Sequence, residues 1–198
     1  MKATNIHGQA YEFYSWDKLG QDIFKLSQQI IKSGQKFDRI IALAKGGLTF
    51  SRSLVDFLDV PNLSSFQIEF YTGIGTTQKM PVIIQSLPVS VRDESVLIFD
   101  DLVDKGETMK MAVDYVKYHG VKKITTATLI TKPWSEFKID FFAYESRAWV
   151  IFPNEIRETI TTLSNMWQQK GDSPDQIQQQ LLEIGFNQAE VALFFKVR

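Results

Sequence analysis

Short apolar runs alternate with amphipathic stretches along most of the chain. The runs at residues 39–43 (RIIAL) and 96–99 (VLIF) are nearly free of polar side chains, as is typical of strands buried on both faces of a parallel sheet. Further strands are predicted at residues 65–71, 81–85, 123–130, 141–144 and 149–152. The spacing predicts strand–helix–strand units, and therefore an α/β fold whose central, mainly parallel β-sheet is flanked by helices.

Three helices are predicted between these strands from apolar residues that recur every three or four positions. The first has Ser15 as its cap and ends near Gly34, and its apolar stripe, which should cover a sheet, is Trp16, Leu19, Ile23, Leu26 and Ile30. The second runs through Leu54, Phe57 and Leu58, and the third, which ends at Gly120, presents Met109, Ala112, Val113 and Val116.

Strand signals stop after residue 152, and the rest of the chain reads as helix. Ser173, Pro174 and Gln176 form a capping-box start, Gly185 ends that helix, and Asn187 begins another. We therefore expect residues 1–157 to form one domain and residues 158–198 a C-terminal helical extension. The extension either packs against the domain or binds a partner, and the sequence leaves both roles open.

Composition narrows the classes of function. The formal net charge is -1, so there is no general basic field for nucleic acid, and an anionic ligand must be bound locally. The chain contains no cysteine, which excludes disulfides and thiolate metal sites. No apolar run is long enough for a signal peptide or a membrane helix. We expect a cytoplasmic enzyme that binds neither nucleic acid nor membrane.

Candidate chemistry lies directly after the apolar run VLIF. Asp100 and Asp101 come at the carboxyl end of that strand, where ligands bind in open α/β folds. The following LVDKGET turns into a helix, so the amides of residues 104–108 can surround a phosphate, and Gly106 lets the phosphate approach the backbone. Carboxylates accept hydrogen bonds from vicinal hydroxyls, which suits a ribose. The alternative is that the two acids only cap the helix.

The whole segment VLIFDDLVDKGET resembles the phosphoribosyl pyrophosphate (PRPP) signature of the type I phosphoribosyltransferases. Every position matches except Lys105, where threonine is usual. The resemblance implies that Asp100 and Asp101 bind the ribose. It implies that the 5′-phosphate is bound by Asp104, Lys105, Gly106, Glu107 and Thr108.

A second segment, IIALAKGGLTF, resembles the pyrophosphate loop of the same family. Lys45, Gly46 and Gly47 would then bind the leaving pyrophosphate. The family resemblance also implies a cis peptide between Ala44 and Lys45. A glycine turn at the end of a strand, with a solvated lysine, is the alternative.

Two later segments, LITKPW and AWVIFPNE, resemble the branch of the family that acts on 6-oxopurines. Lys132 would donate to the oxygen at purine position 6, and Trp149 and Val150 would line the base site in a small base-binding hood. Glu155 would lie near magnesium. Asn154 stands where the family usually has tryptophan, and a plain packing role for Trp149 is the alternative.

The resemblance implies a purine salvage enzyme. It would transfer ribose 5-phosphate from PRPP to hypoxanthine, guanine or xanthine and release pyrophosphate and a nucleoside monophosphate. Asp104 would take the proton from the purine and Lys132 would stabilise charge on its oxygen, while Mg²⁺ would lie near Glu155, Asp100 and Asp101.

Two further expectations, and two alternatives, accompany this resemblance. A loop at residues 72–80 would close over the site, with Tyr71 and Lys79 as contacts, and the protein would be a homodimer or homotetramer. A transferase for adenine, uracil or orotate is one alternative. A PRPP-sensing regulatory protein with the same fold is the other.

Overall fold

The protein, described here by a computed structural model over residues 3–72 and 79–196, forms two compact units. Gly20–Glu145 make up the first, here called the core unit. Met1–Leu19 and Ser146–Arg198 make up the second, here called the terminal unit. The boundary predicted between residues 157 and 158 stays a prediction. No helix among the described residues is long and apolar enough to cross a membrane.

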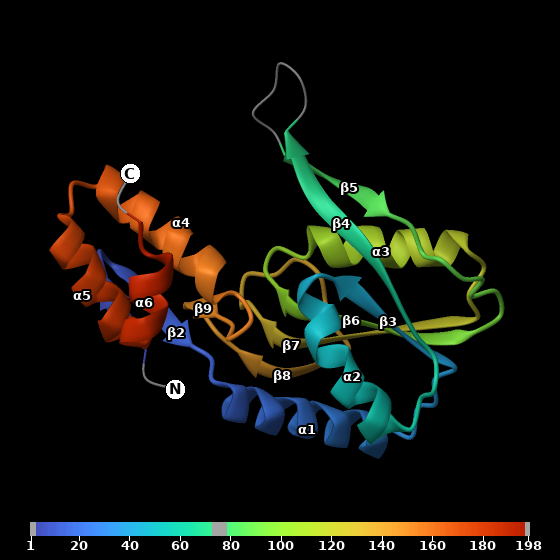
Figure 1. Cartoon of the computed structure of the whole chain (residues 1–198). Helices are drawn as coiled ribbons and strands as arrows, with labels where there is room; N and C mark the ends of the chain where they lie inside the picture. The colour runs from blue at the N-terminus through green and yellow to red at the C-terminus, as the bar shows by residue number, and fades with distance from the viewer. Residues whose placement is uncertain (1–2, 73–78, 197–198) are drawn as a thin grey trace. The chain divides into compact units, whose positions relative to one another are not determined.

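The core unit is built on a six-stranded sheet with the order β5-β4-β3-β6-β7-β8 (Figure 1). All neighbouring strands are parallel except β4 and β5, which form an antiparallel pair at one edge. The predicted α/β fold is confirmed. The strands are β3 (Arg39–Ala44), β4 (Leu63–Thr72), β5 (Lys79–Gln85), β6 (Ser95–Val103), β7 (Lys123–Thr131) and β8 (Phe141–Glu145).

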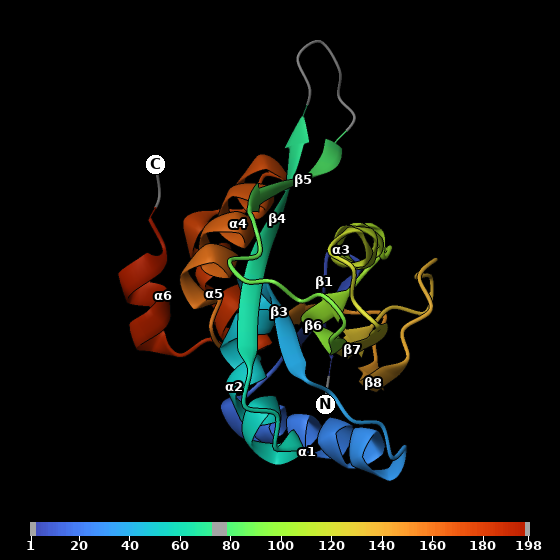
Figure 2. The same cartoon turned by 90° about the vertical axis from the view of Figure 1, so that its right-hand side faces the viewer.

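Helices cover both faces of this sheet, with α3 (Glu107–Tyr118) on one face and α2 (Gly46–Leu58) on the other (Figure 2). Alternate residues of the central strands face opposite sides, so Ile41 and Ile98 join the apolar cluster that includes the buried face of α3. α1 (Trp16–Lys32) packs beside α2, where Phe24 meets Phe57 edge-on at 5.6 Å between ring centroids. The central strands are buried on both faces, which explains their continuous apolar sequence.

Two details differ from the predicted helices and strands. β6 does not end at Phe99 but continues through both aspartates to Val103, because its partner β7 also extends and Val103 pairs with Thr131. Trp16 was expected in the buried stripe of the first helix. It is 57% exposed, because it is the first residue of α1, where the helical stripe has barely begun.

The terminal unit contains a three-stranded sheet of β1 (Thr4–Ile6), β2 (Gln9–Phe13) and β9 (Trp149–Ile151). β2 runs parallel to β9, and Tyr11 pairs with Trp149. Three helices follow: α4 (Ile156–Gln169), α5 (Pro174–Ile184) and α6 (Gln188–Phe194). Both predicted helix starts are confirmed, since Ser173 and Asn187 each form a capping box.

The apolar faces of these helices are buried within the terminal unit. Trp167 of α4 is fully buried and meets Tyr11 of β2 edge-on at 5.9 Å between ring centroids. Ile177, Leu181 and Val191 belong to the same cluster. The apolar residues of the three helices therefore pack against the small sheet.

Candidate functional site

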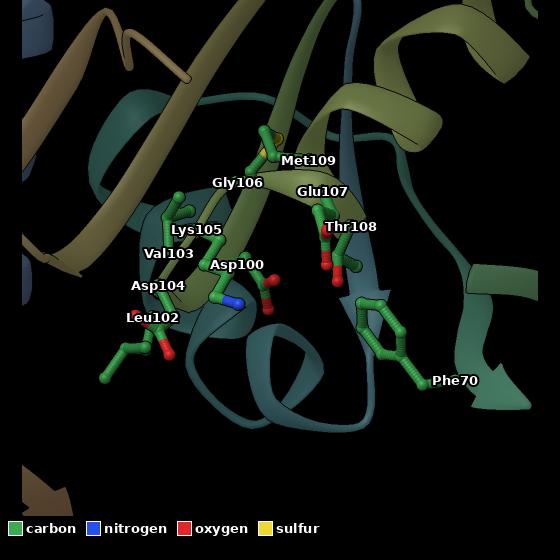
Figure 3. A pocket seen from close by; sticks show the side chains of 10 residues that line it. All are labelled: Phe70, Asp100, Leu102, Val103, Asp104, Lys105, Gly106, Glu107, Thr108 and Met109. Carbon is green, nitrogen blue, oxygen red and sulfur yellow. The ribbon is translucent and has the colours of Figure 1, made fainter. Parts of the chain in front are cut away.

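A cavity of about 510 Å³ lies at the carboxyl end of β6 (Figure 3). Its walls come from β4, the end of β6, the loop that follows and the first turn of α3. The lining residues are Phe70, Asp100, Leu102, Val103, Asp104, Lys105, Gly106, Glu107, Thr108 and Met109. Six of these are residues that the sequence predicted to bind a ribose or a phosphate. The predicted phosphate-binding residues, 104–108, are thus brought together around one cavity.

The start of α3 is suited to bind an anion. Its N-cap is Gly106, which has φ +95° and provides no side-chain hydrogen bond to the first turn. The amide groups of a helix start carry partial positive charge and need acceptors, which a bound phosphate supplies. Gly106 also packs directly on Phe137, with no room for a Cβ. Only glycine combines this left-handed backbone with so close a contact.

The two aspartates of β6 have different surroundings. Asp100 lines the cavity, whereas the carboxylate of Asp101 packs against Gly46 and accepts a hydrogen bond of 2.8 Å from the Leu102 amide. Burial, and then the neighbouring charge of Asp101, raise the pKa of Asp100 well above its usual range. Burial raises the pKa of Asp101 too. Two buried carboxylates side by side disfavour full ionisation, so this pair is suited to bind hydroxyl groups or a cation.

The predicted pyrophosphate loop lies against the same end of β6. Lys45 precedes α2, and Gly46 and Gly47 are the first two residues of that helix. A Cβ on Gly47 would lie 2.6 Å from the Phe99 carbonyl oxygen and 3.0 Å from the Asp100 Cα. The peptide between Ala44 and Lys45 is cis, as the family resemblance implies. The close approach explains the two glycines sterically and places a second helix start beside the aspartates.

Lys132 and Asp104 are linked through a residue to which sequence reasoning gave no role. Lys132 follows β7, is 7% exposed, and its amide donates to the Val103 carbonyl over 3.1 Å. Its Nζ lies 5.8 Å from the centroid of the Trp134 ring. The indole Nε1 of Trp134 donates to Asp104 Oδ1 over 2.6 Å. The two predicted catalytic residues therefore contact one indole ring.

The predicted base and magnesium residues of the hood lie in the terminal unit. Trp149 of β9 is 41% exposed, with its ring 6.1 Å from that of Tyr11. Val150 is buried, and Glu155 is the N-cap of α4. All the other predicted site residues belong to the core unit. The roles of Trp149, Val150 and Glu155 stay predictions.

The predicted lid falls partly outside the described residues. Residues 73–78 are not described, nor are the side chains of Tyr71 and Lys79. Closure of this loop and its two contacts stay predictions. Within the described part of β4, Phe70 lines the cavity opposite the first turn of α3, although sequence reasoning had not selected it.

Comparison with known proteins agrees with the geometry. The family model described as "Phosphoribosyl transferase domain" matches residues 9–159. The chain belongs to the phosphoribosyltransferase family. This confirms the resemblance first seen in VLIFDDLVDKGET.

Similar proteins in this family include purine enzymes. The xanthine-guanine phosphoribosyltransferase of Gluconobacter oxydans is 30% identical over 146 residues, which are 72% of this chain and 83% of that protein. The hypoxanthine-guanine phosphoribosyltransferase of Bacillus subtilis is 31% identical over 113 residues, 55% of this chain and 63% of that protein. The crystal structure of a purine phosphoribosyltransferase from Pyrococcus horikoshii matches with a TM-score of 0.66 at 31% identity, covering 72% of this chain and 93% of that one.

The donor set of this phosphoribosyltransferase fits magnesium better than a metal bound by protein alone. Among the described residues, no group of three or more His, Cys, Asp or Glu side chains could hold a metal ion. Asp100 nonetheless offers a carboxylate at the cavity, with Asp101 next to it, and burial raises the pKa of both carboxyl groups. Mg²⁺ typically takes one or two carboxylates and completes its shell with substrate phosphates and water.

Proposed function

We propose that this protein is a purine salvage enzyme that transfers ribose 5-phosphate from PRPP to a 6-oxopurine base and releases pyrophosphate. The observation that carries the proposal is the convergence of three features on the end of β6. These are the uncapped start of α3, the aspartate pair of β6 and the two glycines that begin α2. They suit the phosphate, ribose and pyrophosphate parts of PRPP.

The three parts of PRPP are assigned to three groups of residues. The 5′-phosphate accepts hydrogen bonds from the amides of residues 104–108 and from the Thr108 hydroxyl. Asp100, which lines the cavity, accepts from the ribose hydroxyls. Asp101 supports that arrangement through its contact with Gly46. The pyrophosphate is bound by Lys45, Gly46 and Gly47.

The proposed transfer depends on stabilising the positive charge that develops on the ribose. Positive charge develops on the ribose as the bond to pyrophosphate breaks, and fixed dipoles and charges stabilise that state without a covalent intermediate. Asp104 accepts the proton from purine N7. Lys132 donates to the oxygen at purine position 6, and Trp149 covers the base.

Magnesium would be held by Asp100 and Asp101 together with substrate oxygens, and the role of Glu155 near the ion stays a prediction from the family resemblance. When bound, the ion would neutralise charge on the departing pyrophosphate. We also propose that the enzyme is a cytoplasmic homodimer or homotetramer, and that its partners are small molecules rather than nucleic acid or membranes.

The test is turnover with each base. The protein is incubated with PRPP, Mg²⁺ and hypoxanthine, guanine, xanthine, adenine, uracil or orotate, and pyrophosphate release is followed. We expect release with at least one 6-oxopurine. Turnover with adenine, uracil or orotate alone would establish the first alternative. PRPP binding without turnover on any base would favour a sensing protein. The double variant Asp100→Asn, Asp101→Asn should bind PRPP more weakly, and unchanged affinity would refute the ribose assignment.

A further inference from the structure

We propose that Trp134 is a positioning residue for both predicted catalytic groups, holding the carboxylate of Asp104 through its indole N–H and the ammonium of Lys132 over its ring. The inference rests on the proposed function and adds a residue that the family signature does not contain. Three sets of contacts in the core unit support it.

The hydrogen bond between Trp134 and Asp104 is short, and only the indole N–H can be its donor. An indole N–H is only a donor, so it can pair with a carboxylate oxygen but not with an ammonium group. Its 2.6 Å distance to Oδ1 is slightly shorter than the roughly 2.7–2.9 Å typical of an N–H group bound to a charged acceptor. A carboxylate has two oxygens, so the bond orients the group while the second oxygen can still accept a proton.

The contact with Lys132 uses the face of the same ring. The Nζ lies 5.8 Å from the ring centroid, within the distance at which an ammonium is attracted by an indole. Lys132 is 7% exposed and Trp134 is 47% exposed. Because the Trp134 ring is this exposed, it contributes little to packing of the core. Its contacts with Asp104 and Lys132 therefore account better for its position than burial does.

The backbone around Trp134 is tied to the phosphate-binding loop. The Ser135 amide donates to the Lys132 carbonyl over 3.0 Å, and the Glu136 amide donates to the Lys105 carbonyl over 3.1 Å. Phe137 packs directly on Gly106. The loop that carries the indole therefore keeps a fixed position relative to residues 104–108.

Asp104 needs such a support because of where it lies. It is an exposed residue at the start of the loop whose amides are to receive a phosphate. A carboxylate that turned over those amides would repel the phosphate and compete for its donors. By fixing one carboxylate oxygen, Trp134 holds the carboxylate in one orientation and limits this competition.

Two substitutions separate the two contacts. Trp134→Phe keeps a ring under Lys132 and removes the N–H, whereas Trp134→Leu removes both. We expect Trp134→Phe to lower kcat about tenfold, as for loss of a hydrogen bond to a charged group, with KM for PRPP and the base changed less than about twofold. Trp134→Leu should lower kcat further and raise KM for the base about threefold or more, because the contact with Lys132 is lost too.

The matched control is Trp16→Phe. Trp16 is also exposed, at 57%, but lies in the terminal unit, and its replacement should leave both kinetic constants unchanged. If the wild type turns over a 6-oxopurine and Trp134→Phe keeps its kcat within twofold, the inference is wrong and the proposed function stands. If the wild type turns over no 6-oxopurine, the proposed function fails, and the kinetic part of the inference fails with it.

A spectroscopic measurement tests the contact without any activity. The chain has four tryptophans, so its indole N–H groups give four resonances, and Trp134→Phe identifies the one from Trp134. Asp104→Asn should shift that resonance more than the other three. A Trp134 resonance that does not move in Asp104→Asn would overturn the inference, whatever the kinetics show.

Discussion

Replacing Gly47 with alanine tests the closest packing in the predicted pyrophosphate loop. A Cβ at this position would lie 2.6 Å from the carbonyl oxygen of Phe99 and 3.0 Å from the Cα of Asp100. Both are backbone atoms of β6, and Phe99 is paired with Ala42 of β3 on one side and Ala127 of β7 on the other. Because this central strand cannot yield, the start of α2 must move away from it.

Two opposing terms determine the size of the effect. Forcing an extra methyl group into a packed interior costs about 1–3 kcal/mol, whereas alanine gains about 0.5–1 kcal/mol over glycine inside a helix. The difference between the two terms is a net loss of stability of about 0–2.5 kcal/mol. At about 2–4 °C per kcal/mol for a protein of this size, Tm falls by up to roughly 10 °C. Affinity for pyrophosphate should fall more steeply, by tenfold or more, because the displaced amides no longer face the ligand.

The assay compares thermal unfolding with calorimetric titration of pyrophosphate. The matched control is Gly20→Ala in α1, where a Cβ would meet nothing within 4 Å, and which should be stabilised by about 0.5–1 kcal/mol without loss of affinity. If Gly47→Ala unfolds at the wild-type temperature and binds pyrophosphate as tightly, the steric explanation for the glycine pair is refuted.

Three further predictions follow from individual residues. Burial and the charge of Asp101 raise the folded-state pKa of Asp100, so the stability that Asp100 contributes is complete below its unfolded pKa of about 3.9 and is lost as the pH rises. Asp100→Asn should therefore unfold at a higher temperature than the wild type at pH 7, and this difference should shrink toward pH 4. The affinity of Asp100→Asn for PRPP should fall. Gly106→Ala, at φ +95° and against Phe137, should cost about 1–2 kcal/mol from the backbone alone and weaken phosphate binding, and unchanged phosphate titration would contradict this. Trp167→Ala should destabilise the terminal unit by about 3–5 kcal/mol, seen as faster hydrogen exchange in β2 and β9, and unaltered exchange there would count against its central packing role.

The sequence predicted the core unit better than the terminal unit, for a physical reason. Strands such as β3 and β6 are buried on both faces, so nearly every residue is apolar and the run is easy to recognise. β1 and β2 were not predicted. They have three and five residues, several of them polar. β2 pairs with the even shorter β1 on one side and, on the other, with β9, more than a hundred positions later. A short strand that depends on so distant a partner leaves little local signal.

In the candidate site, too, residues that are neighbours in the sequence were easier to predict than residues from distant parts of the chain. Contiguous residues, 100–108, were found because one strand, one turn and one helix start bring them together. Phe70 and Trp134 were missed because each reaches the site from another part of the chain. Phe70 did carry a signal, since it has the same strand parity as the buried Phe66 and Ile68, and it emerges at the cavity where β4 passes the core. The indole contact of Trp134 with Asp104 had no such signal.

The end of β6 concentrates features that oppose stability. Asp100 lies half-buried beside the buried Asp101, and burial and then the charge of Asp101 raise the pKa of Asp100. Gly106 has a left-handed backbone without a side-chain cap, and Gly47 stands in a helix where the backbones nearly touch. Asp100 could be replaced by a residue that folds more favourably, whereas the two glycines are required because the atoms packed against them leave no room for a Cβ. Local conflicts with stability that meet at one cavity indicate a binding requirement rather than a folding one. The features at the end of β6 therefore indicate a ligand-binding site there without reference to the family resemblance.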